Sequence, residues 1–355
     1  MLLAILVVIS AAFLVTSSAS STGGQEVGTA TYVNGPMGSG TITLAAVGDV
    51  CFGIDVAPVL NTRGFAYPWA AEKQSLSQAD LTICNLESCL TTRGQPNPSQ
   101  TSFPQRGDPG AVTAMHDAGV DLVVLANDHI MDYGEEGLAD TIAALDRSGI
   151  AHCGAGFTAA QAQAPAIEDI SGSKVAFLAF TDVVLSGYQA EESKPGVAAA
   201  GDASQVENAV RNARAVSDYV VVYFHWGETS ETATRPAQVD LAHAAIDAGA
   251  AAVIGSHPHV LQGLEEYHGG LIAYSMGNFV FNPPREEGRQ SAILQVRLGR
   301  GRLEAADIFP VYITLCQPFP ARGAKAEDIL SRMAQLSTSL GTSLQLSNES
   351  ATVRF

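Results

Sequence analysis

Positively charged residues are scarce in this sequence. Its 355 residues include 19 Lys plus Arg, only four of them lysine, against 36 Asp plus Glu, and the net charge is −17. An acidic surface repels nucleic acid and anionic lipid headgroups, so the composition argues against nucleic acid as a partner. An anionic substrate would be repelled as well unless a local positive charge, such as a bound metal ion, offset the field.

Cysteine is also scarce. The five cysteines are odd in number and include no Cys-x-x-Cys pair. This excludes a disulfide-stapled scaffold and argues against a thiolate zinc knuckle. One disulfide remains open if the chain is exported, with Cys84 and Cys89 as the nearest pair.

A long apolar run is missing too. The N-terminal run has about 14 residues, fewer than the roughly 20 that span a bilayer. We therefore interpret residues 1–19 as a signal peptide, with Ala19 before the cleavage point, or as a retained N-terminal anchor. No Lys or Arg precedes Arg63, so a misassigned start is a third alternative. Either of the first two places the domain outside the cytoplasm.

The rest of the chain alternates short apolar runs with helical patterns. Residues 20–40, rich in Ser, Thr and Gly, indicate a linker, residues 41–345 a domain, and residues 346–355 a tail. The patterns predict strands at 42–47, 81–84, 121–126, 174–180, 219–224, 250–254, 271–276 and 292–298, and helices at 108–119, 135–149, 203–215, 236–249 and 326–340. This alternation predicts an α/β domain whose strands are covered on both faces.

Polar side chains follow six of these predicted strands, each where the strand ends. They are Asp49; Asn85 and Glu87; Asn127, Asp128 and His129; His225; His257 and His259; and Asn278. In α/β folds, ligands gather just beyond the C-terminal ends of the strands. Six such groups at matching positions predict one shared site.

The residue types in this set suit divalent metals. Imidazole, carboxylate and amide groups bind zinc, manganese or iron, and a bridging carboxylate can hold two ions about 3.5–4 Å apart. Pro258 restricts the turn between His257 and His259, which helps to aim both imidazoles at one centre. The set therefore predicts a site for divalent ions, two in number.

Taken singly, these residues have ordinary explanations. Asp49 could form a turn, Glu87 could be a solvated surface carboxylate, and His225 could pack against Trp226. The two later histidines could lie in a surface loop. Only their shared place at the strand ends favours the metal site.

At these residues the sequence resembles the poly-γ-glutamate capsule-synthesis family (CapA type) of the calcineurin-like metallophosphatase superfamily. The matching pieces are GDVCFG, CNLES, LANDHIMDYGEEGL, FHWG, GSHPHVLQG and YSMGNFVF, in the order and rough spacing of the family. The resemblance covers about residues 42 to 340. It implies a four-layer α/β/β/α sandwich with a dinuclear metal site at one edge.

The resemblance also implies roles for single residues. The implied metal ligands are Asp49, Glu87, Asn127, Asp128, His225, His257 and His259. Among them, Glu87 would occupy the position of the bridging carboxylate. His129 would act as the acid or as a stabiliser of the transition state. Asn85, Asn278 and Glu228 would support the ligands or contact the substrate.

The sequence departs from the family pattern in three places. Cys51 stands where the superfamily has the His of Asp-x-His, so it is either a soft ligand or a core residue. Asp128 replaces the second of two Asn residues before the His, and a carboxylate is also a good ligand. Glu228 is followed by Thr rather than by the expected Glu-Tyr arrangement, which leaves the substrate contacts there open.

Together these features predict an extracytoplasmic metal-dependent hydrolase or transferase. A metal-activated water would attack a phosphoester or amide bond in capsule or poly-γ-glutamate biosynthesis. One alternative is a non-catalytic accessory subunit of a membrane-bound polymer synthase or export complex. Another is a secreted phosphatase unrelated to capsule. The substrate would be an anionic polymer or a phosphoester.

Overall fold

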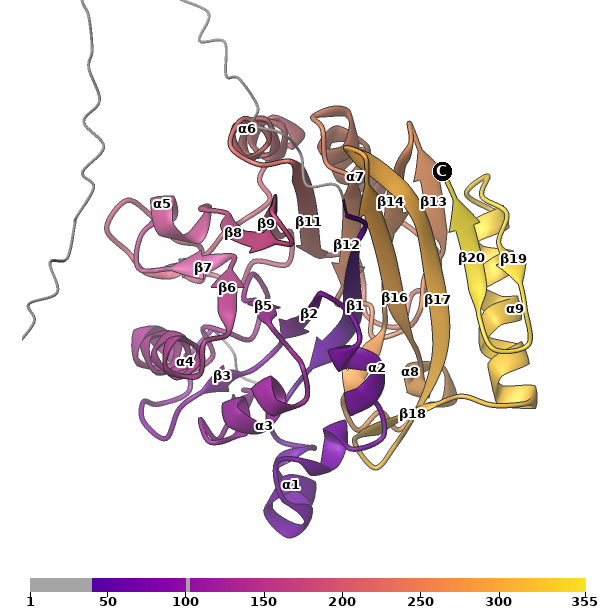
Figure 1. The fold of residues 1–355 in the computed structure, drawn as a ribbon. Coiled ribbons are helices and arrows are strands. Elements are labelled where there is room, and N and C mark those ends of the chain that lie inside the picture. The colour runs from indigo at the N-terminus through magenta and orange to yellow at the C-terminus, as the bar shows by residue number, and fades with distance from the viewer. Residues whose placement is uncertain (1–39, 100–102) are drawn as a thin grey trace, which may run out of the picture. The chain divides into compact units, whose positions relative to one another are not determined.

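Two large β-sheets carry the fold (Figure 1). The computed structural model describes residues 40–99 and 103–355, and these described residues belong to one compact unit. The predicted leader, residues 1–19, and all of the predicted linker except residue 40 lie outside the described residues.

The larger sheet has ten strands. Eight are neighbours in the order β19 (Gln345–Leu346), β20 (Ala351–Arg354), β17 (Arg302–Thr314), β16 (Gln290–Gly299), β1 (Ile42–Val50), β2 (Leu81–Leu86), β5 (Leu122–Val124) and β6 (Ala151–Cys153). Beside this path, β15 (Asn278–Val280) pairs with β1, and β18 (Gln317–Pro320) pairs with β17. The strands β1, β2, β5, β6 and β15 are parallel, whereas β16 and β17 are antiparallel to their neighbours.

The smaller sheet has six strands. Its order is β13 (Leu264–Tyr267), β14 (Gly270–Ala273), β12 (Ala252–Ser256), β11 (Tyr219–His225), β9 (Ser173–Thr181) and β8 (Ala166–Ile170), with the inner four parallel. Two short pairs join β3 (Cys89–Leu90) to β4 (Arg106–Gly107) and β7 (Ala155–Gly156) to β10 (Gly196–Val197).

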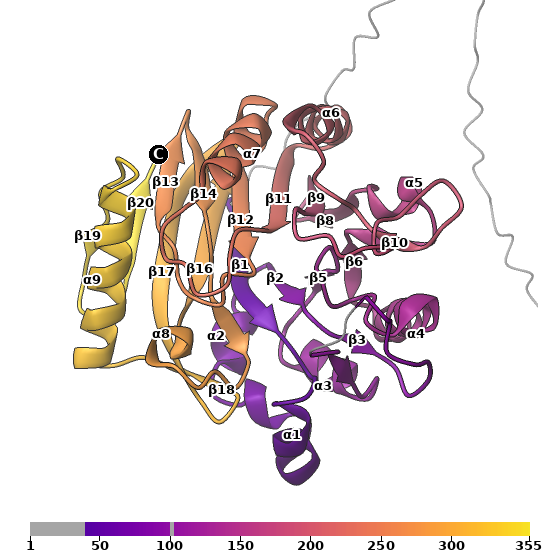
Figure 2. The ribbon, with the colours of Figure 1, turned by 180° about the vertical axis from the view of Figure 1, so that it is seen from behind.

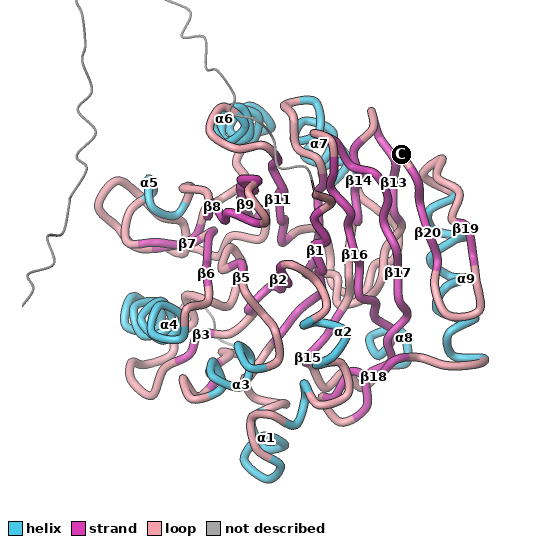
Figure 3. The backbone as a smooth tube through the Cα atoms, in the orientation of Figure 1, coloured by secondary structure: helices cyan, strands magenta, loops and turns pink. Residues whose placement is uncertain are grey.

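The helices lie outside these sheets (Figure 3). They are α1 (Ala57–Arg63), the 3-10 turn η1 (Tyr67–Trp69), α2 (Lys73–Ser77), α3 (Ala111–Asp117), α4 (Gly134–Ser148), α5 (Ala159–Ala162), α6 (Ala203–Arg214), α7 (Pro236–Asp247), α8 (Glu286–Arg289) and α9 (Ala324–Thr338). Over the described ranges, none of them combines the length and the apolar character needed to cross a membrane.

Along β11, side chains alternate between two cores because successive residues of a strand point to opposite faces. Val221 and Tyr223 face the core between the two sheets, whereas Val220 and Val222 face the core that α6 and α7 cover. A strand buried on both faces needs an unbroken apolar run, and the sequence has one at 219–224. The smaller sheet is therefore an inner layer.

The larger sheet is an inner layer as well. In β1, Leu44 and Ala46 face the core between the sheets, whereas Ala45 and Val47 pack in a third core with residues of α2, α3 and α4. The layers are helix, sheet, sheet and helix, which confirms the predicted four-layer sandwich (Figure 2). One side between the sheets is closed by α9, which contacts β13 and β17.

The sequence patterns predicted which strands and helices are present more accurately than they predicted where each one ends. The eight predicted strands and five predicted helices are all present. However, β1 extends to Val50 and β12 to Ser256, so Asp49 and the Gly-Ser before His257 belong to the strands themselves. The strand predicted at 271–276 stops at Ala273.

The tail predicted at 346–355 is instead part of the larger sheet. β20 pairs antiparallel with β17, with Val353 opposite Ala306, and Ala351 and Val353 are buried. Neither strand has a continuous apolar run, and Pro310 interrupts the pattern of β17. A four-residue segment such as β20 becomes a strand only by pairing with a longer one, and a local pattern does not show this.

Removal of residues 351–355 should therefore destabilise the domain. β17 would lose a partner, and the buried valine alone accounts for about 1.5–3 kcal/mol. In urea unfolding we expect the free energy of unfolding to fall by at least about 2 kcal/mol. Arg354→Ala, an exposed position on the same strand, is the control and should change it by less than about 0.5 kcal/mol. An unchanged unfolding midpoint would show that the segment is a dispensable tail.

Candidate metal centre

The C-terminal ends of the parallel strands meet at one edge of the sandwich. Asp49 on β1 lies in register with Asn85 on β2 and with Asn278 on β15. In the smaller sheet, His225 at the end of β11 lies opposite Ser256 at the end of β12. Because parallel strands end on the same side of a sheet, each sheet presents several polar residues at this edge.

The two sheets contribute different ligand types. Three carboxylates lie at or just beyond strand ends of the larger sheet, and three imidazoles lie at or just beyond strand ends of the smaller one: Asp49, Glu87 and Asp128, and His225, His257 and His259. Asn85 joins the two sides, since its Nδ2 lies 2.8 Å from Asp49 Oδ1 and 3.2 Å from His225 Nδ1. The predicted ligands from both sheets are therefore brought into one cluster, in which Asp128 and His259 are partly exposed and the others are buried.

One potential ligand group consists of Asp49, Glu87 and His259. His259 Nδ1 lies 3.0 Å from Asn278 Oδ1 and 3.2 Å from Asp49 Oδ2. When Nδ1 carries the proton and donates it to Asn278, His259 Nε2 is left with a lone pair. That Nε2 lies 3.4 Å from Glu87 Oε1.

A second group consists of Glu87, Asp128, His225 and His257. His225 Nε2 lies 2.9 Å from Asp128 Oδ1 and 3.0 Å from His257 Nδ1. The ligand atoms of each group lie within 4.8 Å of one another. Mixed imidazole and carboxylate donors in such a cluster suit a divalent ion of the zinc, manganese or iron type.

Glu87 belongs to both groups. Its burial, hydrogen bonding and protonation show whether metal ions would fit between the ligands. The side chain is 1% exposed, and its Oε1 is buried without a hydrogen-bond partner among the described residues. Burial, and then the charges of Asp49 and Asp128, hold its pKa well above the usual range. An unpaired buried carboxylate is costly, and cations on both sides would offset that cost. The residues therefore fit two ions that share Glu87.

Three neighbouring groups, Asp49, Asp128 and His257, have pKa values shifted towards the forms that bind metals. Burial raises the pKa of Asp49, but the hydrogen bond and charge of His259 outweigh it and lower the pKa to about 2. Burial raises the pKa of Asp128 too, but the charge of His129, the hydrogen bond and charge of His225 and the charge of His257 together hold it below its usual range. Burial lowers the pKa of His257 to about 3, so its imidazole is neutral and able to bind a metal.

Asn127 holds the loop that follows β5. Its Nδ2 donates to Asn85 Oδ1 and to the Leu86 carbonyl, each at 2.9 Å. Its Oδ1 accepts the backbone N–H groups of His129 and Ile130 at 3.0 and 2.9 Å. Both ends of the amide are used within the protein, an arrangement that positions its neighbours; its role as a ligand stays a prediction.

The histidine pair has an unusual backbone. His257 has a φ of 91° and His259 a φ of 57°, the left-handed region that residues with a Cβ rarely adopt. Pro258 lies between them, and its carbonyl accepts the backbone N–H of Ser230 at 2.8 Å. Strain of this kind gathers at functional sites, and here it turns both imidazoles towards the carboxylates.

His129 lies beside the cluster, and hydrogen bonds on the side away from the ligands fix its ring. Its Nδ1 lies 2.7 Å from Asp132 Oδ2, and the Tyr188 hydroxyl donates to Asp132 Oδ1 at 2.9 Å. Burial lowers the pKa of His129, but Asp128 and Asp132 outweigh it and raise the pKa above the usual value. The sequence analysis did not place Asp132 in the site; its spacing of three residues from His129 is the signal that could have identified it.

Two residues from the sequence analysis lie apart from the ligand groups. The Cys51 thiol donates to Gln105 Oε1 at 3.3 Å, and burial raises its pKa to about 12, which disfavours the thiolate that binds metals. Cys51 therefore fits a core residue rather than a soft ligand. Glu228 is exposed and accepts a hydrogen bond from Arg235 at 3.0 Å, so its contact with a substrate stays a prediction.

The fold of this centre matches that of metallophosphatase-type enzymes. A putative 5′-nucleotidase from Staphylococcus aureus, solved in complex with α-ketoglutarate, superposes with a TM-score of 0.50 and 15% identity. The match covers 84% of this chain and 58% of the other. At that identity the likeness concerns the fold alone, and it defines the class: a metallophosphatase-type sandwich.

Sequence similarity defines the family within that class. The family described as "Bacterial capsule synthesis protein PGA_cap" matches residues 43–283, which include every strand end of the centre. The capsule biosynthesis protein CapA of Bacillus anthracis is 31% identical over 305 residues, 84% of this chain and 74% of the relative. The PGA biosynthesis protein CapA of Bacillus subtilis is 29% identical over 282 residues, 79% of this chain and 74% of the relative. The chain belongs to this capsule synthesis family, as its motifs predicted.

A further relative has a different name. A probable polyglutamine synthesis accessory protein of Mycobacterium tuberculosis is 30% identical over 244 residues, 65% of this chain and 64% of the relative. The three relatives are named for the synthesis of capsule, of PGA and of polyglutamine.

Metal content should follow the division into two groups. We expect about two divalent ions per chain after dialysis against metal-free buffer, measured by inductively coupled plasma mass spectrometry. Glu87→Gln should reduce both ions because both groups include Glu87, whereas His259→Ala should remove only one. His243→Ala is the control, since His243 lies 3.1 Å from Glu265 and belongs to neither group. Full metal content in Glu87→Gln would contradict the shared role.

Proposed function

We propose that this chain is a metal-dependent hydrolase or transferase that acts on a phosphoester or amide bond in capsule or poly-γ-glutamate biosynthesis. The observation that carries the proposal is the place of Glu87 in two ligand groups beside His129. A purely structural zinc site closes around one ion with four ligands and needs no shared carboxylate.

Two ions would share the donor set described above. Asp49, Glu87 and His259 would hold one, and Glu87 with Asp128, His225 and His257 would hold the other. When bound, such ions lower the pKa of a water molecule and stabilise charge on the attacking and leaving oxygens of a substrate. Their positive charge would also offset the acidic field of the chain.

We assign proton transfer to His129. Asp132 fixes the ring through Nδ1, so the opposite nitrogen, Nε2, is the one that faces the cluster, 3.7 Å from Asp128 Oδ2. A raised pKa keeps more of the imidazole protonated near neutral pH, which suits a group that donates a proton to a departing oxygen or nitrogen. Tyr188, which donates to Asp132, fixes the orientation of that carboxylate.

The names of the relatives support a place in polymer synthesis at the cell envelope. We propose that the chain works on the outer side of the cytoplasmic membrane, exported or anchored by residues 1–19. Its partner there would be a membrane-bound polymer synthase or export complex, and its substrate an anionic polymer or phosphoester. The three sequence relatives described above are named for polymer synthesis, so they favour this role over a secreted phosphatase unrelated to capsule.

One observation favours a second candidate function. The mycobacterial relative is named as an accessory protein. A chain that binds metal for stability and supports the polymer synthase without catalysis would fit that name. The two functions differ in what they require of His129, which lies in neither ligand group.

His129→Ala should strongly reduce turnover, while the fold and the metal content remain as in the parent. General acid catalysis contributes about 10²–10⁴-fold, so we expect kcat to fall by that factor. Asp132→Asn should lower kcat less, because the ring remains but is less firmly held. The substrates are a phosphomonoester, a phosphodiester and a γ-glutamyl amide, and the exposed His116 gives the control, His116→Ala.

The same variant separates the two functions in a capsule-forming strain whose own copy has been replaced. Loss of polymer, at an unchanged level of the His129→Ala protein, supports catalysis. A normal polymer yield would overturn the hydrolase and favour the accessory role.

A further inference from the structure

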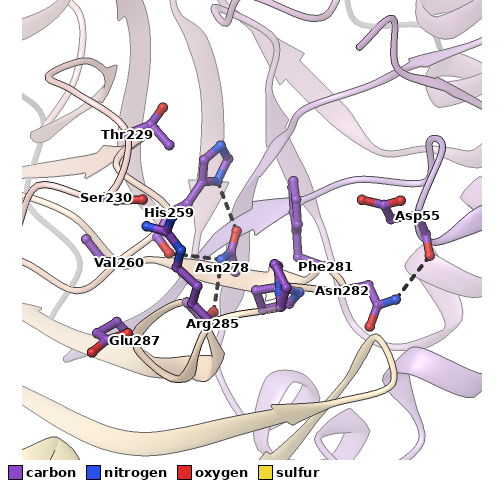
Figure 4. Close-up of a pocket in the computed structure, with 13 residues that line it drawn as sticks. Asp55, Thr229, Ser230, His259, Val260, Asn278, Phe281, Asn282, Arg285 and Glu287 are labelled. Carbon is purple, nitrogen blue, oxygen red and sulfur yellow. Dashed lines mark hydrogen bonds between the residues drawn. The ribbon is translucent and has the colours of Figure 1, made fainter. Parts of the chain in front are cut away.

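A pocket of about 510 Å³ opens beside the metal centre. His259 and Asn278 line the end nearest the centre. Residues 281–288, the connection from β15 to α8 together with the start of α8, contribute most of the other lining residues (Figure 4). Thr229 and Ser230, which follow β11, form another part of the wall. A molecule in this pocket would therefore touch a predicted metal ligand.

Asn278 fixes this segment to the metal centre. Its Oδ1 lies 3.0 Å from His259 Nδ1, and its Nδ2 donates to the carbonyls of His259 and Gly288 at 3.0 and 2.9 Å. Arg289 Nε donates to the Pro283 carbonyl at 3.2 Å and braces the segment internally. The loop is thus held in place relative to His259 by one amide.

Arg285 is the positive group of this pocket. Over residues 40–99 and 103–355 its guanidinium forms no ion pair, whereas Arg235 pairs with both Glu228 and Glu231. In Figure 4 the Arg285 side chain extends towards the end formed by His259 and Asn278. A guanidinium offers a planar fork of donors that matches the two oxygens of a carboxylate or phosphate.

The two acidic residues that line the pocket do not pair with Arg285. Glu287 points away from the metal end at the outer rim, and Asp55 lies beyond Phe281 (Figure 4). The Phe281 ring stands with its centre 4.9 Å from that of His259, and Pro283 and Pro284 add apolar surface. This combination offers an oxyanion contact next to room for an aliphatic stem.

We propose that this pocket binds an oxyanion of the substrate, a carboxylate or a phosphate on an aliphatic stem, and that Arg285 is the residue that selects for it. The proposal rests on the proposed function for the identity of the reacting bond, which would lie at the His259 end. The His259 imidazole makes its polar contacts with Asp49, Glu87 and Asn278 rather than with Arg285, so Arg285 is assigned to substrate binding and not to metal binding.

Calorimetric titration of the full chain tests the proposal with two probes, glutarate and inorganic phosphate. Each is titrated into zinc-loaded and into chelator-treated protein. We expect Arg285→Ala to weaken the binding of at least one probe about ten- to a hundredfold, the usual range for a lost charged hydrogen bond. Arg285→Lys, which keeps the charge but loses the fork, should give a smaller loss.

Arg302→Ala is the matched control. Arg302 is exposed, starts β17 at the opposite end of β16 from the pocket, and its loss changes the net charge by the same amount. Binding in this variant should stay within about twofold of the parent, since exposed charges beyond a Debye length are screened. Thermal unfolding midpoints equal to that of the parent show that the variants are folded.

The outcomes identify the oxyanion and separate the two proposals. A loss confined to glutarate assigns a carboxylate, and a loss confined to phosphate assigns a phosphate. Unchanged binding in Arg285→Ala, an equal loss in Arg302→Ala, or no binding by the parent overturns the pocket assignment. Dependence on Arg285 in chelator-treated protein upholds it even where the protein holds no metal or shows no turnover, which would overturn the proposed function alone.

Discussion

The docking of the two sheets is the constraint on which the metal centre depends. The carboxylates follow strands of the larger sheet and the imidazoles follow strands of the smaller one, so neither sheet alone holds a complete ligand group. Contacts across the join set their spacing: Asn85 reaches His225, and the Tyr223 hydroxyl donates to the Val47 carbonyl at 3.0 Å. A shift of one sheet against the other would separate the two halves of the site.

Burial makes this arrangement costly unless cations are present. Asp49 and Glu87 are almost fully buried, and Asp128 lies beside them. Carboxylates removed from water require compensation by opposite charge and hydrogen bonds. Imidazoles compensate Asp49 and Asp128, whereas Glu87 Oε1 accepts no hydrogen bond within the part of the chain that the structure describes. Because metal ions would bind only the docked arrangement, their binding would stabilise the sandwich as well as prepare the site.

The sequence predicted the part of the site that local patterns encode. A buried parallel strand is a continuous apolar run, so Asp49 and His225 stand out as the polar residues at which such runs end. The resemblance to the capsule family then supplied the sandwich. Contacts between residues far apart along the chain leave no such local pattern, as with Tyr188 and Asp132, which are 56 positions apart. Arg285 also gave no signal, because it lies in a loop whose sequence has no periodicity. The strand β20 was missed for the same reason, since only its pairing with β17 makes it a strand.

The net charge of −17 raised an objection to an anionic substrate, and the geometry of the edge answers it. Charges separated by more than about 8–10 Å are largely screened at physiological ionic strength, so a ligand responds to the groups around it rather than to the whole chain. At this edge Asp49 and Glu87 are turned inward and are almost inaccessible to solvent. Of the predicted ligands, His259 is the one that lines the pocket, and Arg285 lines the adjoining wall. An acidic protein can therefore offer an anion a local positive contact, because Asp49 and Glu87 are buried behind His259 and the Arg285 side chain extends towards the same end of the pocket.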